Sequence, residues 1–184
     1  FRKVIAPNGE RILLHASNFR KIKRVQDVVK IFAAVNKQIP SKLLFVGDGP
    51  ERNTAEDLSR ELGVCDEIRF VGKQEQMEDI LAIADLFLLT SEYESFGLAA
   101  LEAMAAGCPV VSTNAGGLGE INIQGVTGFL SNVGDVESMT QQAVQILKDD
   151  NTLQGFKERA AAHSRKFDIH HSVPQYEKLY ERFL

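Results

Sequence analysis

Two carboxylates, Glu94 and Glu102, have seven residues between them inside an otherwise apolar, alanine-rich segment, EYESFGLAALEAMAAG (92–107). Acidic side chains are almost never fully buried unless another group pairs with them. The segment predicts a helix with Glu102 beside an apolar stripe. The expected stripe consists of Leu98, Leu101 and Ala105. We therefore expect a bound ligand to supply the partners of the two glutamates.

The start of this helix offers a place for an anion. The first backbone amides of a helix have no partner within it, and the helix dipole favours negative charge in front of them. These amides belong to Ser95, Phe96, Gly97 and Leu98. Gly97 has no side chain to block a ligand, so a diphosphate fits here and Glu102 can accept hydrogen bonds from ribose hydroxyls. The alternative is a solvated helix with incidental acidic residues.

A second group of charged residues is the basic run FRKIKR (19–24), which lies between an expected strand and an expected helix. A helix start normally favours acidic residues, so four cations there need a reason. A pyrophosphate leaving group is one, because Lys and Arg stabilise the charge that grows as the bond to it breaks. The alternative is a solvated basic turn. We assign Lys21 and Arg24 to the surface.

The elements that position these residues follow from the hydrophobic pattern. Strands are expected at residues 11–17, 42–47, 67–72, 85–90, 109–113 and 128–130. Helices are expected at residues 23–38, 51–62, 76–84, 97–107, 136–148, 152–163 and 173–183. Alternating strands and helices predict an α/β domain with a doubly wound, Rossmann-like parallel sheet that helices cover on both faces.

Ligands of such sheets bind at the carboxyl ends of the strands. The loops expected there are rich in glycine and charge: SNFRKIK, GDGPE, GKQEQ, TSEYESFG and TNAGGLGE. GDGPE lacks the third glycine of a GxGxxG dinucleotide motif. We assign its Gly49 to a tight turn close to the ligand.

The bulk composition bounds the function. The chain has 184 residues, which suits one domain, with 44% hydrophobic residues and a formal net charge of −4. That charge does not favour nonspecific nucleic-acid binding. We see no membrane-spanning run and no signal peptide, and Cys65 and Cys108 suit reduced thiols, so we expect a cytoplasmic protein. The first residue is Phe1 rather than methionine, which suggests a fragment.

The segment EYESFGLAALEAMAAGCPVVSTNAGGLGEI, with FVGDGPE upstream, closely resembles the E-x7-E signature of retaining GT-B glycosyltransferases, family 4. The resemblance covers essentially the whole chain. It implies that residues 1–184 are the nucleotide-sugar-binding lobe of a GT-B fold, and that an N-terminal acceptor-binding lobe lies outside this chain. It also implies that no metal and no cofactor is needed.

The resemblance implies roles for particular residues. Glu102 would bind the ribose hydroxyls, and Glu94 would lie by the donor hexose. Amides of Phe96, Gly97 and Leu98 would contact the sugar and the phosphates. Lys23 matches the family lysine that neutralises the diphosphate leaving group.

Other positions match the family less directly. The family usually has an arginine five residues before the lysine, where this chain has Asn18, with Arg20 two residues later. Whether Arg20 supplies the missing charge stays open. The backbone of Val71, Gly72 and Lys73 occupies the place where the family holds the nucleobase.

The run SNFRKIKRV further resembles family members of bacillithiol biosynthesis that transfer N-acetylglucosamine from UDP-N-acetylglucosamine to L-malate. We therefore expect these two substrates. One alternative is a nucleotide-sugar epimerase of related architecture, for which we identify no acid/base groups. The other is a non-catalytic nucleotide-binding regulatory domain.

Overall fold

The structure is a computed structural model that describes residues 2–183, apart from the side chains of residues 171, 172 and 175. The described residues form six strands: β1 (Arg11–Ser17), β2 (Ser41–Gly47), β3 (Ile68–Gly72), β4 (Leu86–Leu89), β5 (Val110–Thr113) and β6 (Gly128–Ser131). The α-helices are α1 (Arg2–Ile5), α2 (Val25–Asn36), α3 (Arg52–Glu61), α4 (Met77–Ile83), α5 (Leu98–Ala105), α6 (Leu118–Ile121), α7 (Val136–Leu147), α8 (Asp150–Ser164) and α9 (Ile169–Tyr180). Short 3₁₀-helices are η1 (Lys21–Lys23), η2 (Cys65–Glu67) and η3 (Arg165–Phe167).

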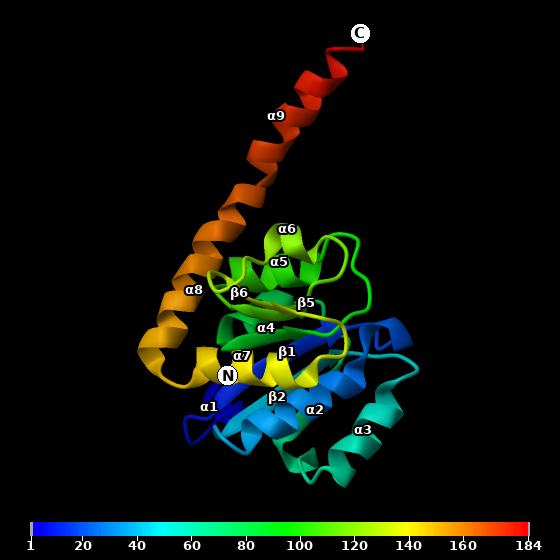
Figure 1. The fold of residues 1–184 in the computed structure, drawn as a ribbon, viewed down its shortest axis with the longest axis vertical. Helices are drawn as coiled ribbons and strands as arrows, with labels where there is room; N and C mark the ends of the chain where they lie inside the picture. The colour runs from blue at the N-terminus through cyan, green and yellow to red at the C-terminus, as the bar shows by residue number, and fades with distance from the viewer. Residues whose placement is uncertain (1, 184) are drawn as a thin grey trace.

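The strands form one parallel sheet in the order β3-β2-β1-β4-β5-β6 (Figure 1). The chain winds outward from β1 to β3, crosses back, and continues from β4 to β6. This is the doubly wound arrangement that the alternating pattern predicts, so the predicted fold class is confirmed.

Two apolar cores lie on opposite faces of the sheet, because successive side chains of a strand point to opposite faces. One core joins the sheet to α2 and α7, through strand residues such as Leu13, Phe45 and Leu88. The other joins it to α4, α5 and α6, through residues such as Leu14 and Phe87. Both faces are covered, which explains why the strands read as continuous apolar runs.

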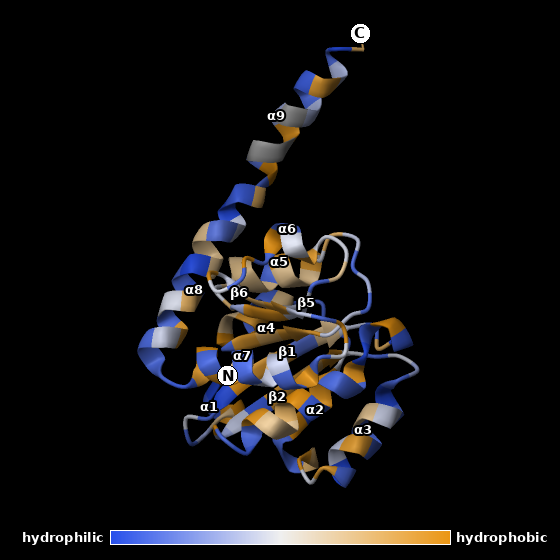
Figure 2. Cartoon of the chain, viewed as in Figure 1, coloured by the Kyte–Doolittle hydropathy of each residue, from blue (hydrophilic) through white to orange (hydrophobic). Residues whose placement is uncertain are grey.

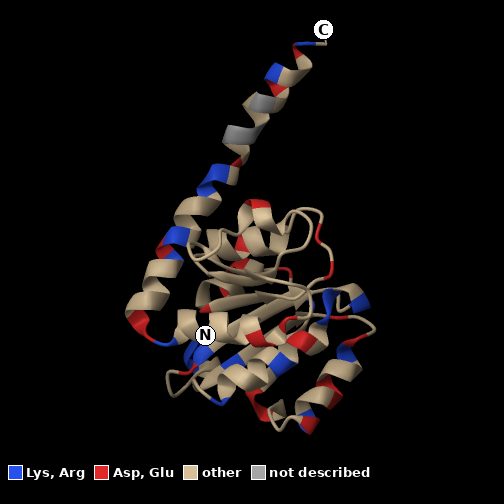
Figure 3. Ribbon diagram, in the orientation of Figure 1, with Lys and Arg blue, Asp and Glu red and all other residues tan. Residues whose placement is uncertain are grey.

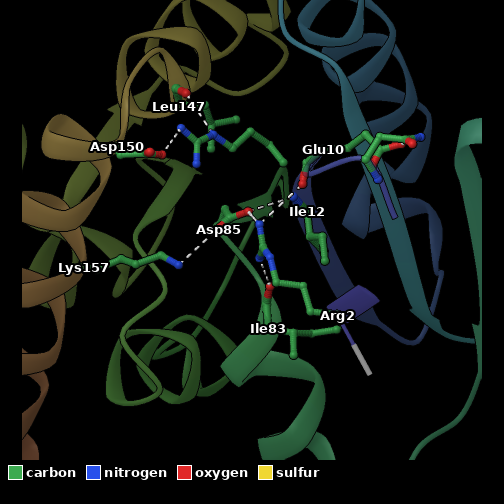
Figure 4. A network of polar contacts seen from close by, with 10 residues as sticks. Arg2, Glu10, Ile12, Ile83, Asp85, Leu147, Asp150 and Lys157 are labelled. Atoms are coloured by element: carbon green, nitrogen blue, oxygen red, sulfur yellow. Dashed lines mark hydrogen bonds and ion pairs between the residues drawn. The ribbon is translucent and has the colours of Figure 1, made fainter. Parts of the chain in front are cut away.

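The buried carboxylate of Asp85, next to β4, ties three segments of the chain together (Figure 4). It accepts hydrogen bonds from Arg2 of α1 at 2.6 Å, from Lys157 of α8 at 2.9 Å and from the backbone amide of Ile12 at 3.0 Å. Burial on its own raises the pKa of Asp85, but the Arg2 hydrogen bond and the Lys157 charge outweigh it and lower that pKa. Asp85 is therefore a charged anchor for both ends of the domain.

Helix α8 packs on the body of the domain, whereas α9 leaves it. Leu153 and Phe156 of α8 join one core and Ala160 joins the other, so α8 crosses the edge of the sheet. Beyond η3, α9 projects away from the other elements (Figure 1) and carries apolar residues along its exposed surface (Figure 2). The exposed apolar residues of this end of the chain are Ile169, Val173, Tyr176, Leu179, Tyr180 and Phe183.

The helix expected from residue 23 begins later, at Val25. Lys23 instead ends η1, and Arg24 has a left-handed backbone with φ +49°. A non-glycine residue in that region interrupts a right-handed helix. The glycine-rich loop expected after β5 contains a helix too, the four-residue α6.

Candidate functional site

The candidate site lies where the strand order reverses, between β1 and β4. The loops that follow these two strands diverge there, as in other doubly wound sheets. Hydrogen bonds hold them together: Thr90 Oγ1 donates to Lys23 O at 2.8 Å, and the Glu92 amide donates to Ile22 O at 2.8 Å. The loop after β1 therefore rests on the loop after β4.

Lys23 and Glu94 form an ion pair across these two loops. Lys23 Nζ lies 2.5 Å from Glu94 Oε1, and the two side chains are only 19% and 15% exposed. Ser91, a fully buried residue, also donates its hydroxyl to Glu94 Oε1, at 2.7 Å. Glu94 thus has partners within the chain, so the expectation that its carboxylate needs a ligand to provide them is wrong.

Figure 3 colours the Lys and Arg residues of the chain blue and its Asp and Glu residues red. The remaining cations of the basic run differ in their ion-pair partners. Arg24 pairs with Asp27 at 2.7 Å and with Glu92 at 3.1 Å. Arg20 is exposed and precedes η1, and within residues 2–183 neither it nor Lys21 forms an ion pair. Arg20 and Lys21 are therefore exposed cations without an ion-pair partner among the described side chains.

A buried histidine fixes the loop that carries Asn18. His15 Nδ1 lies 2.9 Å from Leu88 O, which can only accept, so Nδ1 donates and Nε2 accepts from the Ser17 hydroxyl at 2.8 Å. Ser17 Oγ in turn accepts from the Phe19 amide, and Phe19 has φ +39°. Burial lowers the pKa of His15 to about 4, although the Leu88 hydrogen bond acts the other way. His15 is therefore neutral near pH 7.

Gly49 lies against the same loop. A Cβ at Gly49 would come within 2.0 Å of Asn18 O, and the Glu51 amide donates to Phe19 O at 2.9 Å. Asn18 is exposed at this point. The loops after β1 and β2 are thus in direct contact, and only glycine allows that approach.

The loop after β3 completes this side of the site. Gly72 ends β3 with φ +71°, Val71 is half-buried and Lys73 is exposed. Lys73, Gly49 and Asp48 line a hollow of about 300 Å³. Of the three expected nucleobase positions, Lys73 therefore lies next to the Gly49 turn.

Helix α5 begins as predicted, but it buries a different face. Its N-cap is Gly97, with φ +92° and no side-chain cap, so the first amides of the helix are free for a ligand. A Cβ at Gly97 would lie 2.5 Å from Leu118 Cδ2 of α6. The buried helix residues are Ala100, Ala103 and Met104.

The expected stripe of Leu98, Leu101 and Ala105 is therefore wrong, and Leu98 is 63% exposed. Nearly every residue of α5 is small or apolar, so periodicity could not choose the buried face. Ser95 is exposed, while Phe96 is half-buried with its ring 6.1 Å from the ring of Phe167.

Among the described residues, no hydrogen bond or ion pair joins Glu102 to the Lys23–Glu94 pair. Glu102 is exposed, and its carboxylate forms no hydrogen bond or ion pair with the described residues. With Arg165 and Phe167 of η3, it lines a hollow of about 330 Å³ between α5 and the end of α8. Because Glu102 is exposed, its carboxylate needs no partner within the chain. The open hollow leaves room for a ligand that donates a hydrogen bond to it.

Sequence reasoning missed Ser91, whose hydroxyl contacts Glu94. A serine three residues before an acidic residue is a common surface pattern, so spacing carried no signal. Among the side chains that the structure describes, no three of His, Cys, Asp or Glu gather as a possible metal site. In the described part of the chain, no helix combines the length and the apolar character needed to cross a bilayer.

The six-stranded parallel sheet, with a cation, a carboxylate and an uncapped helix start at its carboxyl edge, is one lobe of a GT-B fold. Residues 1–163 match the family described as "Glycosyl transferases group 1", and the chain belongs to that family.

Three known proteins illustrate the similarity. The chain is 47% identical over 173 residues to N-acetyl-alpha-D-glucosaminyl L-malate synthase of Bacillus anthracis, covering 94% of this chain and 45% of that protein. It is 33% identical to 2-deoxystreptamine N-acetyl-D-glucosaminyltransferase of Niallia circulans, covering 81% and 40%. The crystal structure of Anabaena HepE in complex with UDP superposes with a TM-score of 0.87 at 25% identity, covering 98% and 51%. The chain thus spans less than half the length of both curated relatives.

Proposed function

We propose that this chain is the donor-binding lobe of a retaining glycosyltransferase that transfers N-acetylglucosamine from UDP-N-acetylglucosamine to L-malate. The observation that carries the proposal is the Lys23–Glu94 pair, with 2.5 Å between Nζ and Oε1, at the point where the strand order reverses. The pair consists of a cation that can bind a diphosphate and a carboxylate that can accept hydrogen bonds from sugar hydroxyls.

The choice of substrates has support from the relatives. Both curated relatives carry N-acetylglucosaminyl in their names, and the one at 47% identity also carries L-malate. HepE, at 25% identity, is solved with UDP. We therefore assign the diphosphate and the nucleoside of the donor to UDP.

The residues take the following roles in the proposal. Lys23 and Arg20 neutralise the diphosphate, and amides of the 95–98 segment bind the phosphates and the sugar. Glu94 accepts from the hexose hydroxyls, and Glu102 accepts from the ribose. The nucleobase lies against the backbone of residues 71–73, beside Gly49 and Asn18.

In the proposed reaction, the acceptor hydroxyl attacks the anomeric carbon on the face that the diphosphate leaves. The bond between that carbon and the diphosphate oxygen breaks as the new glycosidic bond forms. The hydroxyl proton passes to the departing diphosphate, whose growing charge Lys23 and the helix amides stabilise. No step requires Glu94 to act as a nucleophile.

The second lobe belongs to the proposal as well. We assign residues 1–184 to one lobe, and the acceptor-binding lobe to the rest of the protein. The exposed apolar side of α9, with Tyr176 and Tyr180 at 62% and 65% exposure, suits packing against such a lobe.

The test is a transfer assay on the full-length protein with radiolabelled UDP-N-acetylglucosamine, with and without L-malate. Malate-dependent formation of the glycoside is the expected result. Isomerisation of the sugar nucleotide without acceptor would favour an epimerase instead. Binding without any turnover would favour a regulatory domain.

A further inference from the structure

Ser91 lies where its hydroxyl can hold the carboxylate of Glu94 in place. It follows β4, its side chain is fully buried, and its hydroxyl donates to Glu94 Oε1 at 2.7 Å. Lys23 Nζ contacts the same oxygen at 2.5 Å. Within the described residues, Oε2 has no hydrogen-bond partner. Two donors thus converge on one carboxylate oxygen and leave the other free to accept.

The backbone around Glu94 is held as well. The Gly117 amide donates to Glu94 O at 2.9 Å, and a Cβ at Gly116 would come within 1.9 Å of that same oxygen. Thr113, the last residue of β5, donates its hydroxyl to Ser91 O at 2.6 Å. The neighbouring strand and its loop therefore fix both residues of the Ser91–Glu94 contact.

The two donors to Glu94 Oε1 differ in what else they can bind. Lys23 is 19% exposed and would be drawn toward a diphosphate, because two negative phosphates compete with one carboxylate for its charge. Ser91 is enclosed, so its hydroxyl has no competing external acceptor. Ser91 can hold the Glu94 carboxylate in place while Lys23 serves the diphosphate.

We propose that Ser91 is a positioning residue that keeps Glu94 Oε2 directed at the donor hexose when Lys23 engages the diphosphate. The inference rests on the proposed function, because it takes Glu94 as the acceptor of hexose hydrogen bonds. Rigid support of such a group lowers the cost of orienting it when the sugar binds.

The test compares the affinities of the full-length protein for UDP and for UDP-N-acetylglucosamine by calorimetry, because UDP has no hexose. Ser91→Ala should leave UDP affinity within about twofold, weaken the sugar nucleotide about tenfold and lower kcat. A general structural defect would weaken both ligands alike. Ser91→Thr, which keeps the hydroxyl, should restore the preference for the sugar nucleotide.

Ser112→Ala is the matched control. Ser112 is also fully buried, on the adjacent β5, but its hydroxyl contacts Asn122 Nδ2 at 3.0 Å rather than Glu94. This variant should keep both affinities. If Ser91→Ala does not fold, Ser91→Cys keeps the shape with a much weaker donor and should lose the preference in the same way.

Unchanged preference and unchanged kcat in Ser91→Ala or Ser91→Cys would overturn the inference. Glu94→Ala separates that failure from failure of the proposed function. If Glu94→Ala loses the preference while the Ser91 variants keep it, only the positioning role fails. If Glu94→Ala also keeps it, the assignment of Glu94 to the donor hexose fails first.

Discussion

The ammonium nitrogen of Lys23 lies 2.5 Å from Oε1 of Glu94, although 71 positions separate the two residues in the chain. Lys23 ends the 3₁₀-helix after β1, and Glu94 lies in the loop after β4. The contact therefore bridges the two loops that diverge where the sheet reverses its order. Each side chain offsets the charge of the other in a site that water reaches only in part.

Lys23→Ala in the full-length protein should lower kcat by roughly 100-fold, with a much smaller loss of affinity for the intact sugar nucleotide. The charge on the diphosphate grows in the transition state, so a cation there acts mostly on rate. Steady-state kinetics check this. Lys21→Ala, which removes an exposed cation two positions earlier, should change little. A raised KM with kcat intact would make Lys23 a ground-state binder.

Glu102→Ala should weaken UDP binding by roughly 1.5–3 kcal/mol, the range for a hydrogen bond to a charged group. Its carboxylate faces an open hollow and has no partner among the described residues, so the change should leave folding intact. Glu102→Gln should cost less, because an amide oxygen still accepts. Calorimetry measures both, with Glu61→Ala, an exposed glutamate at the end of α3, as control. Unchanged affinity in Glu102→Ala would remove the ribose assignment.

Asp85→Ala should lower the free energy of unfolding by about 3 kcal/mol, because it leaves Arg2 and Lys157 without their buried counter-charge. Urea unfolding followed by circular dichroism measures the loss. Asp150→Ala breaks the Arg11–Asp150 pair, whose carboxylate is 89% exposed, and should have little effect. Equal losses in the two variants would contradict the anchoring role of Asp85.

Acid should destabilise the protein in a window set by His15. Its pKa is about 4 in the native state, because burial opposes the charged form, against an ordinary value of 6.5. The unfolded chain therefore binds a proton that the native state does not, and stability falls as the pH drops from about 6.5 to 4. The total loss is about 3 kcal/mol.

The groups that act electrostatically on His15 are Lys23 and Glu94, which oppose each other. NMR titration of the His15 ring gives the direct measurement, with no chemical-shift change expected above about pH 5.5. A midpoint near 6.5 would contradict the buried neutral ring. Asp85 contributes to stability separately. Because its pKa in the native state lies below the ordinary value of 3.8, the stability that it provides is lost only as the pH falls below 3.8.

The isolated 184-residue chain should fold and bind UDP but transfer no sugar. It encloses two apolar cores of its own, and the proposed donor contacts lie within it. Transfer needs an acceptor held against the anomeric carbon, which supplies much of the rate. Incubation with UDP-N-acetylglucosamine and L-malate, followed by mass spectrometry, is the measurement. Product at the full-length rate would place the acceptor site in this lobe.

The fold class and the strand positions follow from the sequence alone, and the sequence also predicts the edge of the sheet that carries the proposed site. Apolar runs such as RILLHAS (11–17) and helical periodicity are local properties of the sequence. They can therefore be recognised without knowing how the chain packs. The spacing of Glu94 and Glu102 and the basic run before α2 also mark the loops at that edge.

The tertiary structure alone decided which of these side chains meet. Lys23 reaches Glu94 only because β1 and β4 are neighbours in the sheet, whereas Glu102 lines a hollow beside the end of α8. The buried face of α5, with Ala100 and Met104, is set by packing against the sheet and Ala160 of α8, which a uniformly apolar helix sequence does not encode. Ser91 and His15 acquired their roles in the same way, since a hydrogen bond needs atoms within about 3 Å and such distances arise only when distant segments pack.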